Sequence, residues 1–306
     1  MLDAVTGFAV VGVAIVVGYV IGRINLLGET GGAVLGRLVY FVLSPVLLFV
    51  VLADADVHTL FSALLPVSAI TATVIILGYA AIARFVWRRS TADTLIGALA
   101  AGQVNSNNIG IPLSLYILGS AAYPAPVILF QLLFLTPISM AIFEATTAGG
   151  ASARRIAVRT ITNPIVVGSL LGVLASVSDI ELPAVVSEPL GFLAAACVPL
   201  LLIRYGMSLH GQRVLGAAES RPDIILGTAL KLVAMPLLAW VLAEFVFGLG
   251  AHDVLIVVVL ASLPSAQNVY NYAQRFGVGQ IIARDTILLT TILCIPLLLI
   301  VTVLLG

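Results

Sequence analysis

The chain has 306 residues, of which 61% are hydrophobic and 9% are charged, and its formal net charge is zero. A soluble domain usually carries about a quarter charged residues, most of them on its water-facing surface. The composition therefore excludes a soluble domain, and the zero net charge gives no indication of a nucleic-acid partner.

Apolar runs separated by charged or Gly/Pro-rich stretches predict an all-α polytopic membrane protein with ten spanning helices. Each run is long enough to cross a hydrocarbon core of roughly 30 Å. The predicted spans cover residues 5–22, 33–53, 62–86, 94–119, 124–143, 160–177, 190–209, 223–247, 252–275 and 284–305.

Basic residues gather at the odd-numbered connections between these spans. They are Arg23, Arg37, Arg84, Arg88, Arg89, Arg154, Arg155, Arg159, Arg204, Arg213, Arg221, Arg275 and Arg284. The even-numbered connections have acids instead, namely Asp54, Asp56, Asp179, Glu181, Glu188 and Asp253. Since basic loops stay cytoplasmic, we expect a multi-pass protein of the cell membrane with both termini outside the cell or in the periplasm.

The remaining small signals predict no processing, metal or cofactor. The N-terminal segment MLDAVTG contains Asp3 and no basic residue, which does not fit a signal peptide. Cys197 and Cys294 lie inside apolar runs, where small core residues are expected rather than a disulfide or metal ligands.

Landmarks recur in the same order in the two halves of the chain. The paired landmarks are Gly18 and Gly22 with Gly168 and Gly172, Pro45 with Pro199, Gly119 with Gly277, and Pro137 with Pro296. Each one alone also fits ordinary close packing or a kink. Together they predict two five-helix repeats. Because five is an odd number, tandem copies would lie inverted in the membrane, as in secondary transporters.

The fourth and ninth predicted spans each combine amides with a proline. The fourth reads LAAGQVNSNNIGIPLSLYILG and the ninth VLASLPSAQNVYNYAQRFG. Proline removes a backbone donor, and Gly and Asn tolerate non-helical backbone, so we expect each span to break into two half-helices. The residues expected at the breaks are Gly110, Pro112 and Pro264.

Two broken helices at matching positions would cross near the midplane and present amides and helix ends to a small solute. The candidate substrate-binding residues are Asn105, Asn107, Asn108, Gln267, Asn268 and Asn271. The alternative is that these amides only join helices by hydrogen bonds, which is a common use of Asn and Gln in membranes.

The NSNNIGIP and SLPSAQN segments, the ten spans and the outside termini resemble the auxin efflux carrier family, and the resemblance covers the whole chain. It implies a fold like that of sodium/proton antiporters and bile-acid transporters, and a homodimer. It also implies scaffold helices in residues 1–61 and 151–215 and a mobile transport unit in residues 62–150 and 216–306. The short link at 144–160 differs from the long central loop of the plant members, which favours a prokaryotic member and argues against auxin as the substrate.

Lys231 and Arg204 are possible anion-attracting residues, because charges inside a membrane are costly. Both are close enough to the interface for the alternative that they snorkel to water. No Asp or Glu lies in the middle of a predicted span, and the three His residues lie in loops. A proton-coupled mechanism is therefore not expected.

These features predict a secondary transporter that exports a small organic anion by elevator-like alternating access. The membrane potential favours export by about 2.3 kcal/mol per charge per 100 mV. A sodium-coupled organic anion symporter is the alternative. An intramembrane enzyme is less well supported, because the sequence lacks paired aspartates and an HExxH motif.

Overall fold

The computed structural model describes residues 2–28, 30–55, 64–147, 161–178, 182–208 and 218–306, together with residues 154, 158 and 210. Several residues used in the topology prediction lie outside this described part. They are Asp56, Arg155, Arg159, Asp179, Glu181 and Arg213; the loop residue His58 and Ser152 also lie outside it.

The described residues form helices, and their only extended pairing is an isolated bridge between Val104 and Ser265. Six helices are long and apolar enough to cross a membrane. They are Gly31–Ala53, Leu65–Val86, Ala125–Phe143, Ala184–Met207, Arg221–Val246 and Gln280–Leu305. The prediction of an all-helical polytopic membrane protein is thereby confirmed, whereas the count of ten spans stays a prediction.

The chain divides into two compact units. The first comprises residues 1–61, 107–133 and 158–212, and the second comprises residues 62–106, 134–157 and 213–306. The predicted boundaries differ, because they assign residues 107–133 to the same part as 62–106.

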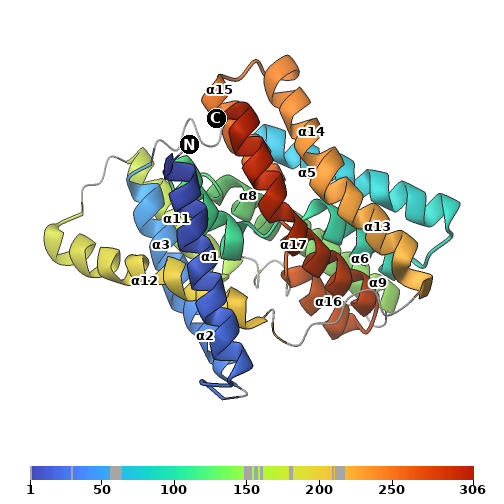
Figure 1. Ribbon diagram of the computed structural model, residues 1–306, viewed down its shortest axis with the longest axis horizontal. Coiled ribbons are helices and arrows are strands. Elements are labelled where there is room, and N and C mark those ends of the chain that lie inside the picture. Colours follow the sequence, from blue (N-terminus) through green and yellow to red (C-terminus); the bar gives the residue numbers. More distant parts are fainter. Residues whose placement is uncertain are drawn as a thin grey trace. The chain divides into compact units, whose positions relative to one another are not determined.

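In the first unit, glycines allow two pairs of helices to pack with their backbones close together. Its helices are α1 (Leu2–Arg23), α2 (Gly31–Leu38), η1 (Val39–Leu43), α3 (Ser44–Ala53), α7 (Ile111–Leu113), η5 (Ser114–Leu118), α8 (Ala125–Phe130), α11 (Pro164–Val177) and α12 (Ala184–Ser208). A side chain at Gly18 of α1 would collide with the backbone of Ile203 in α12, and one at Gly168 of α11 would collide with Pro45 in α3. Helices α1 and α12 therefore run in contact, and so do α3 and α11 (Figure 1).

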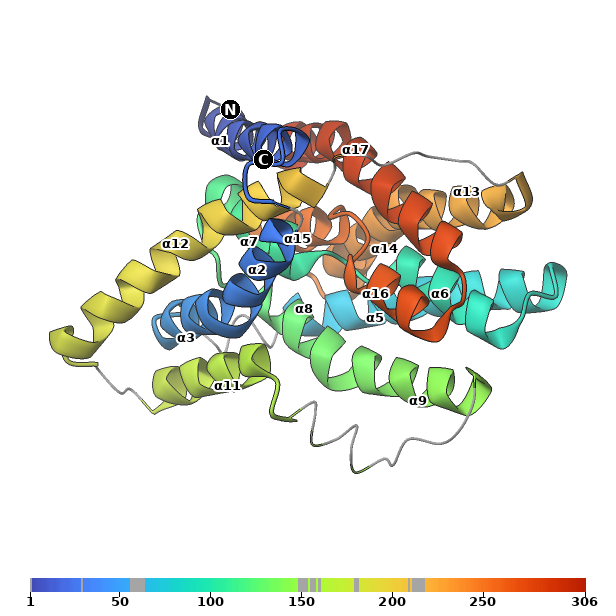
Figure 2. The same ribbon diagram turned by 90° about the horizontal axis from the view of Figure 1, so that it is seen from below.

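The second unit contains the two broken segments and the helices around them. Its helices are α5 (Leu65–Ala81), η3 (Ile82–Val86), α6 (Thr91–Gly102), α9 (Thr136–Thr147), η7 (Ala218–Ser220), α13 (Arg221–Ala229), η8 (Leu230–Ala234), α14 (Met235–Val241), η9 (Leu242–Val246), α15 (Ala251–Ala261), α16 (Asn268–Phe276) and α17 (Gln280–Leu305). The boundary between the units falls inside two further helical segments, η4 (Ser106–Gly110) and η6 (Gln131–Leu135). Helices α6, α16 and α17 contact one another (Figure 2), around a buried core that includes Ile96, Phe143 and Val269.

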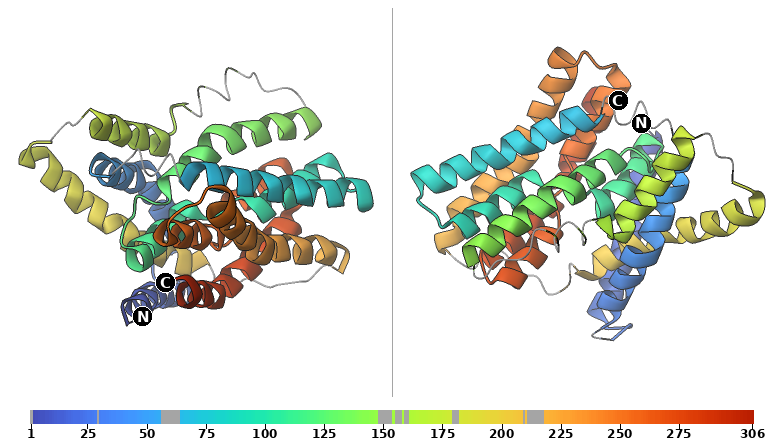
Figure 3. Two further views of the ribbon diagram at one scale, coloured as in Figure 1. Left: turned by 90° about the horizontal axis from the view of Figure 1, so that it is seen from above. Right: turned by 180° about the vertical axis from the view of Figure 1, so that it is seen from behind.

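Two corners of the second unit have the same geometry, 160 residues apart in the chain. After η3, the amide of Arg89 donates to the carbonyl of Ala83 at 2.9 Å, and after η9 the amide of Leu249 donates to Ala243 at 2.9 Å. Between them, Arg88 and Gly248 adopt left-handed backbone with φ of 56° and 58°. The helices that lead into these corners, α5 and α14, contact each other (Figure 3). This match supports an internal repeat.

Candidate functional site

The two broken segments pair with each other through extended backbone. Helix α6 ends at Gly102 and helix α15 ends at Ala261. Beyond these ends, Val104 and Ser265 form an antiparallel bridge. The amide of Asn105 donates to the carbonyl of Pro264 at 2.8 Å, and the amide of Ala266 donates to the carbonyl of Gln103 at 3.1 Å.

This pairing gives the interrupted backbone the partners that a continuous helix would otherwise supply. Pro264 has no N–H group and cannot continue the ladder of α15, but its carbonyl accepts from the opposite segment. Gln103 has extended dihedral angles of −85° and 132°. Unpaired backbone is very costly at membrane depth, so the two breaks stabilise each other.

Hydroxyl groups hold the paired segments against their neighbours. The hydroxyl of Ser265 donates to the carbonyl of Ala100 in the last turn of α6 at 2.5 Å. The amide of Ser265 donates to the hydroxyl oxygen of Thr290 in α17 at 3.1 Å. The hydroxyl of Thr290 lies 2.7 Å from the carbonyl of Thr286, and all three hydroxyl residues are fully buried. Ser265 thus connects both broken segments to α17.

A buried lysine lies at the end of α15. The amino group of Lys231, in η8, donates to the carbonyl of Ala261 at 2.7 Å and to the sulfur of Met235 at 3.0 Å. The side chain of Lys231 is 0% exposed. It does not snorkel to water, in contrast to one of the alternatives considered from the sequence.

The seven amides of the broken segments occupy different environments. Gln103 and Asn105 are buried, and Asn107, Asn108 and Gln267 are partly buried. Asn268 and Asn271 are exposed and lie three residues apart in the first turn of α16, so they share one face of that helix. Asn107 and Asn108 belong to the first unit and the other five to the second.

The interruption in the fourth predicted span lies before Gly110 and Pro112. Residues 103–105 are non-helical, whereas Gly110 and Pro112 lie in the helical segment that follows, which alternates between wide and regular turns. Proline has no N–H for the carbonyl one turn before it, and a widened turn is one way to accommodate that loss. Pro264, by contrast, lies inside the non-helical stretch between α15 and α16. The helical segments after the two interruptions end at Gly119 and Gly277, a pair of landmarks in the sequence, and both glycines have left-handed backbone.

Arg204 belongs to α12, in the first unit, and packs on α2. A side chain at Gly36 would come within 2.6 Å of the Arg204 Nε atom, so the guanidinium lies directly on the glycine backbone. Arg204 is partly exposed. The structure thus places Arg204 against α2 in the first unit, and its role toward anions stays a prediction.

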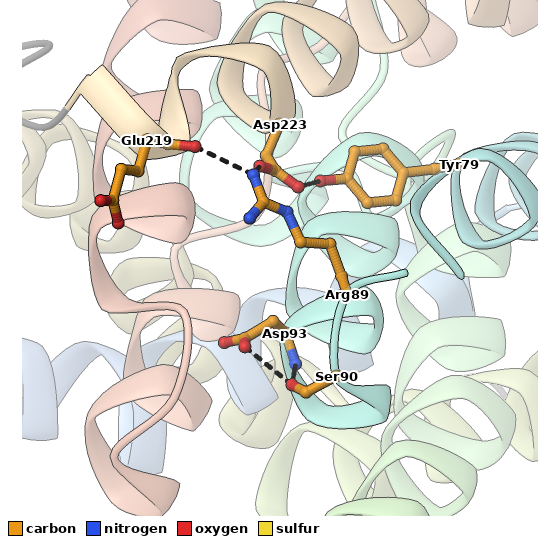
Figure 4. A network of polar contacts seen from close by, with 6 residues as sticks. All are labelled: Tyr79, Arg89, Ser90, Asp93, Glu219 and Asp223. Carbon is orange, nitrogen blue, oxygen red and sulfur yellow. Dashed lines mark hydrogen bonds and ion pairs between the residues drawn. The ribbon is translucent and has the colours of Figure 1, made fainter. Parts of the chain in front are cut away.

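A second polar cluster, which was not recognised from the sequence, lies at the start of α13 (Figure 4). Asp223 accepts from Arg89 at 2.7 Å and from the hydroxyl of Tyr79 at 3.2 Å. Arg89 also donates to the carbonyl of Glu219 at 2.9 Å. Asp223 is the first residue of a predicted span and Arg89 belongs to a predicted loop, and nothing in the sequence joins two positions so far apart. Their only sequence signal is that Asp223 begins a long apolar run.

The buried acids of the second unit are paired with arginines. The side chain of Asp223 is 2% exposed and pairs with Arg89, and that of Asp285 is 0% exposed and pairs with Arg284 at 2.6 Å. Among the described residues, no group of three or more His, Cys, Asp or Glu could hold a metal ion.

Comparison with known proteins places the chain among membrane transporters. The family described as "Membrane transport protein" matches residues 4–152 and again residues 151–302. A Rhizobium meliloti (strain 1021) protein named "Putative malonate transporter" is 29% identical over 92% of this chain and 89% of its own length. An "Uncharacterized transporter" of Methanothermobacter thermautotrophicus is 27% identical over 83% of this chain and 82% of its own length. The double family match coincides with the two halves predicted as repeats.

Proposed function

The chain belongs to the membrane transport protein family, the auxin efflux carrier family that its sequence resembles, and from this premise we propose that it is a secondary transporter that exports a small organic anion. It acts on a solute within a membrane and is not an enzyme. The observation that carries the proposal is the pairing of the two broken segments within the second unit, where Gln103 and Asn105 lie beside Pro264 and Ala266.

The proposed binding groups are the amides that border this pairing. They are Asn105, Asn107, Asn108, Gln267, Asn268 and Asn271. An amide NH₂ group has two donors, and charge-assisted bonds to a carboxylate are stronger than neutral ones. The exposed face of Asn268 and Asn271 offers such donors at the first turn of α16, where the helix N-terminus also favours an anion.

The substrate class that we propose is a monocarboxylate or a dicarboxylate. It rests on the amide donors, on the buried side chain of Lys231, and on the name of the Rhizobium meliloti relative, which mentions malonate. Malonate is therefore the first compound to test.

The proposed mechanism is alternating access of an elevator type. It assumes ten spans, two inverted repeats that cross at the two breaks near the midplane, and termini outside the cell. It also assumes a scaffold in residues 1–61 and 151–215, a mobile part in residues 62–150 and 216–306, and a homodimer. The repeated corners after η3 and η9 and the double family match support the repeat.

We propose that transport is not coupled to protons. The buried acids Asp223 and Asp285 each form an ion pair with an arginine, which gives both carboxylates a structural role. A sodium-coupled symporter is the second candidate, because the hydroxyls of Ser265 and Thr290 and the carbonyl of Ala100 lie together as neutral oxygen ligands.

Flux measurements in proteoliposomes test the proposal. Radiolabelled malonate inside the vesicles should leave faster when the interior is made negative. The rate should be the same with sodium and with potassium outside. Sodium dependence would favour the symporter instead, and good transport of cationic or neutral solutes without any response to voltage would overturn the proposal.

A further inference from the structure

In the first unit, the C-terminal end of α12 lies against α1 and α2, and glycines set these contacts (Figure 2). A side chain at Gly22 of α1 would come within 3.1 Å of the Met207 backbone. One at Gly36 of α2 would come within 2.6 Å of the Nε atom of Arg204 and within 3.0 Å of its Cζ and Nη2 atoms. The guanidinium group is therefore seated flat on the backbone of Gly36.

This guanidinium group carries a permanent positive charge, because arginine is not deprotonated in proteins. Gly36 is the sixth residue of α2, so the charge lies roughly 7 Å inside the start of that helix. Within the part of the chain that the structure describes, Arg204 makes no hydrogen bond and no ion pair. A charge in such a setting is costly without a counter-ion, and the partial exposure of Arg204 leaves it open to one.

The described acids of the first unit do not supply this counter-ion. They lie at the helix ends opposite to that of Arg204, near the starts of α1 and α12 and just after α3. These acids are Asp3, Asp54 and Glu188. Glu29 lies outside the described residues and is removed in one of the variants below.

The length of α12 places Arg204 near the polar headgroups of the bilayer. The helix has 25 residues, which is roughly 37 Å at 1.5 Å per residue, whereas the hydrocarbon core is roughly 30 Å thick. Its last turns therefore extend to the headgroup level, and Arg204 precedes the final residue, Ser208, by four positions.

Apolar side chains continue from Arg204 along the same side of α12. Leu193 and Leu200 precede Arg204 by eleven and four residues, which is close to three turns and one turn of the helix. Leu193 is 38% exposed and Leu200 is partly exposed. An acyl chain can lie on this strip while its headgroup reaches the guanidinium.

We propose that the contact between α2 and α12 is a binding site for the phosphate group of an anionic membrane lipid, with Arg204 as its main ligand. A guanidinium group matches a phosphate through two parallel N–H bonds. Basic sites between spanning helices on the cytoplasmic side bind lipid headgroups of this kind, and the arginine distribution predicts the cytoplasmic side for this end of α12. The inference goes beyond the proposed function, since the site lies in the first unit and takes no transported solute.

The experiment measures the melting temperature of the purified protein in a neutral detergent with added phosphatidylglycerol, phosphatidylcholine or inorganic phosphate. The buffer contains about 0.5 M salt, which screens the exposed arginines Arg23 and Arg37 more than the half-buried Arg204. A ligand that binds only the folded protein stabilises it, so phosphatidylglycerol should raise the melting temperature by about 5 °C relative to phosphatidylcholine. Native mass spectrometry counts the phosphatidylglycerol molecules that stay bound.

Substitutions of charged residues show whether Arg204 is responsible. Arg204→Gln should lose most of the shift and retain fewer lipid molecules. Arg204→Lys should keep part of the shift, because an ammonium group is charged but does not offer the planar fork of donors. Arg37→Gln, the matched control for an exposed arginine, and Glu29→Gln should keep the full shift.

A pair of glycine substitutions tests the geometry while the charge stays. In Gly36→Ala the new methyl group meets the Nε atom of Arg204 and displaces the guanidinium, so the lipid-dependent shift should fall. Gly32→Ala is the matched control on the same helix, because its methyl group would lie 3.8 Å from the side chain of Met207, an ordinary contact. Alanine is favourable in a helix, so this comparison holds even if Arg204→Gln fails to fold.

The same lipid-dependent shift in the wild type, Arg204→Gln and Gly36→Ala, or equal stabilisation by phosphatidylcholine, would overturn the inference. Inorganic phosphate that stabilises the protein as well as phosphatidylglycerol would show a site for soluble anions and overturn the assignment to a lipid. The proposed function is tested separately by malonate flux. A protein that binds phosphatidylglycerol through Arg204 and does not transport small carboxylates would overturn that proposal alone.

Discussion

Val104 and Ser265 lie opposite each other in an antiparallel bridge, although 161 residues separate them in the chain. The same offset separates Asn107 from Asn268. A bridge between equivalent positions of two repeats has local two-fold symmetry, since each residue supplies the partner for the other. This bridge supports the symmetry that the sequence landmarks predict, at the point where both helices are interrupted.

Ser265 is expected to stabilise the fold more than an exposed serine. Its hydroxyl donates to the carbonyl of Ala100 and lies 3.2 Å from the hydroxyl of Thr290. Ser265→Ala removes a buried donor and should cost about 1–3 kcal/mol, seen as a lower melting temperature in detergent. Ser90→Ala is the control, because Ser90 is exposed. This substitution removes only the N-cap of α6, so the stability should fall by about 1 kcal/mol. An unchanged melting temperature in Ser265→Ala would contradict the role assigned to this hydroxyl.

Asp223 is expected to matter for stability and not for proton coupling. Asp223→Asn weakens the ion pair with the partly exposed Arg89, and the melting temperature should fall. The dependence of malonate flux on external pH should stay the same as in the wild type. Arg89→Gln, which leaves the buried carboxylate without its cation, should destabilise the protein more. A pH profile that changes in Asp223→Asn would argue for a proton-coupled mechanism.

The sequence predicts the helices well and the buried polar contacts poorly. Among the described residues, each predicted span coincides with one or more helices. This agreement is expected, because a long apolar run and the glycine or proline that ends a helix are local features of the sequence. The interruption was expected around Gly110 and Pro112 but lies at residues 103–105, because the paired segment around Pro264 fixes its place. The contact of Arg89 with Asp223 joins residues 134 positions apart, and periodicity contains no information about such a contact.

Topology can be tested by labelling with single cysteines. Cys197 and Cys294 are buried and are replaced first. A cysteine at Ser90 should react only with reagents on the cytoplasmic side, as should one at Ser152. A cysteine at Ser178, which ends α11 and is exposed, should react only from outside. If Ser152 and Ser178 were labelled from the same side, the inverted arrangement of the repeats would be wrong.

The two prolines are expected to act differently. Pro264 lies in the non-helical stretch and its carbonyl accepts from Asn105, so Pro264→Ala allows α15 to continue through the break. We expect flux to fall by about ten-fold or more, with a smaller change in the affinity for malonate. Pro112 lies in the helical segment after the other break, and Pro112→Ala should have the smaller effect on flux. Equal losses in both variants would contradict this distinction.

Asn107 and Asn268 are expected to bind the substrate carboxylate from the two repeats. Each Ala substitution removes one amide donor, so the affinity for malonate should fall by about ten-fold, which corresponds to roughly 1–2 kcal/mol. The melting temperature without ligand should change little for Asn268, because its side chain is exposed at the first turn of α16. Calorimetry beside flux in proteoliposomes provides the measurement.

Asn163→Ala is the matched control for these two amides. The Asn163 amide donates to the hydroxyl of Tyr40 at 2.6 Å, and its oxygen caps α11. Its loss should lower the melting temperature and leave the affinity for malonate unchanged. For Asn268→Ala we expect the opposite result, a weaker affinity for malonate and an unchanged melting temperature, because a binding group affects the affinity and a structural group affects the stability. Wild-type affinity and flux in both Asn107→Ala and Asn268→Ala would leave these amides with the structural role of joining helices.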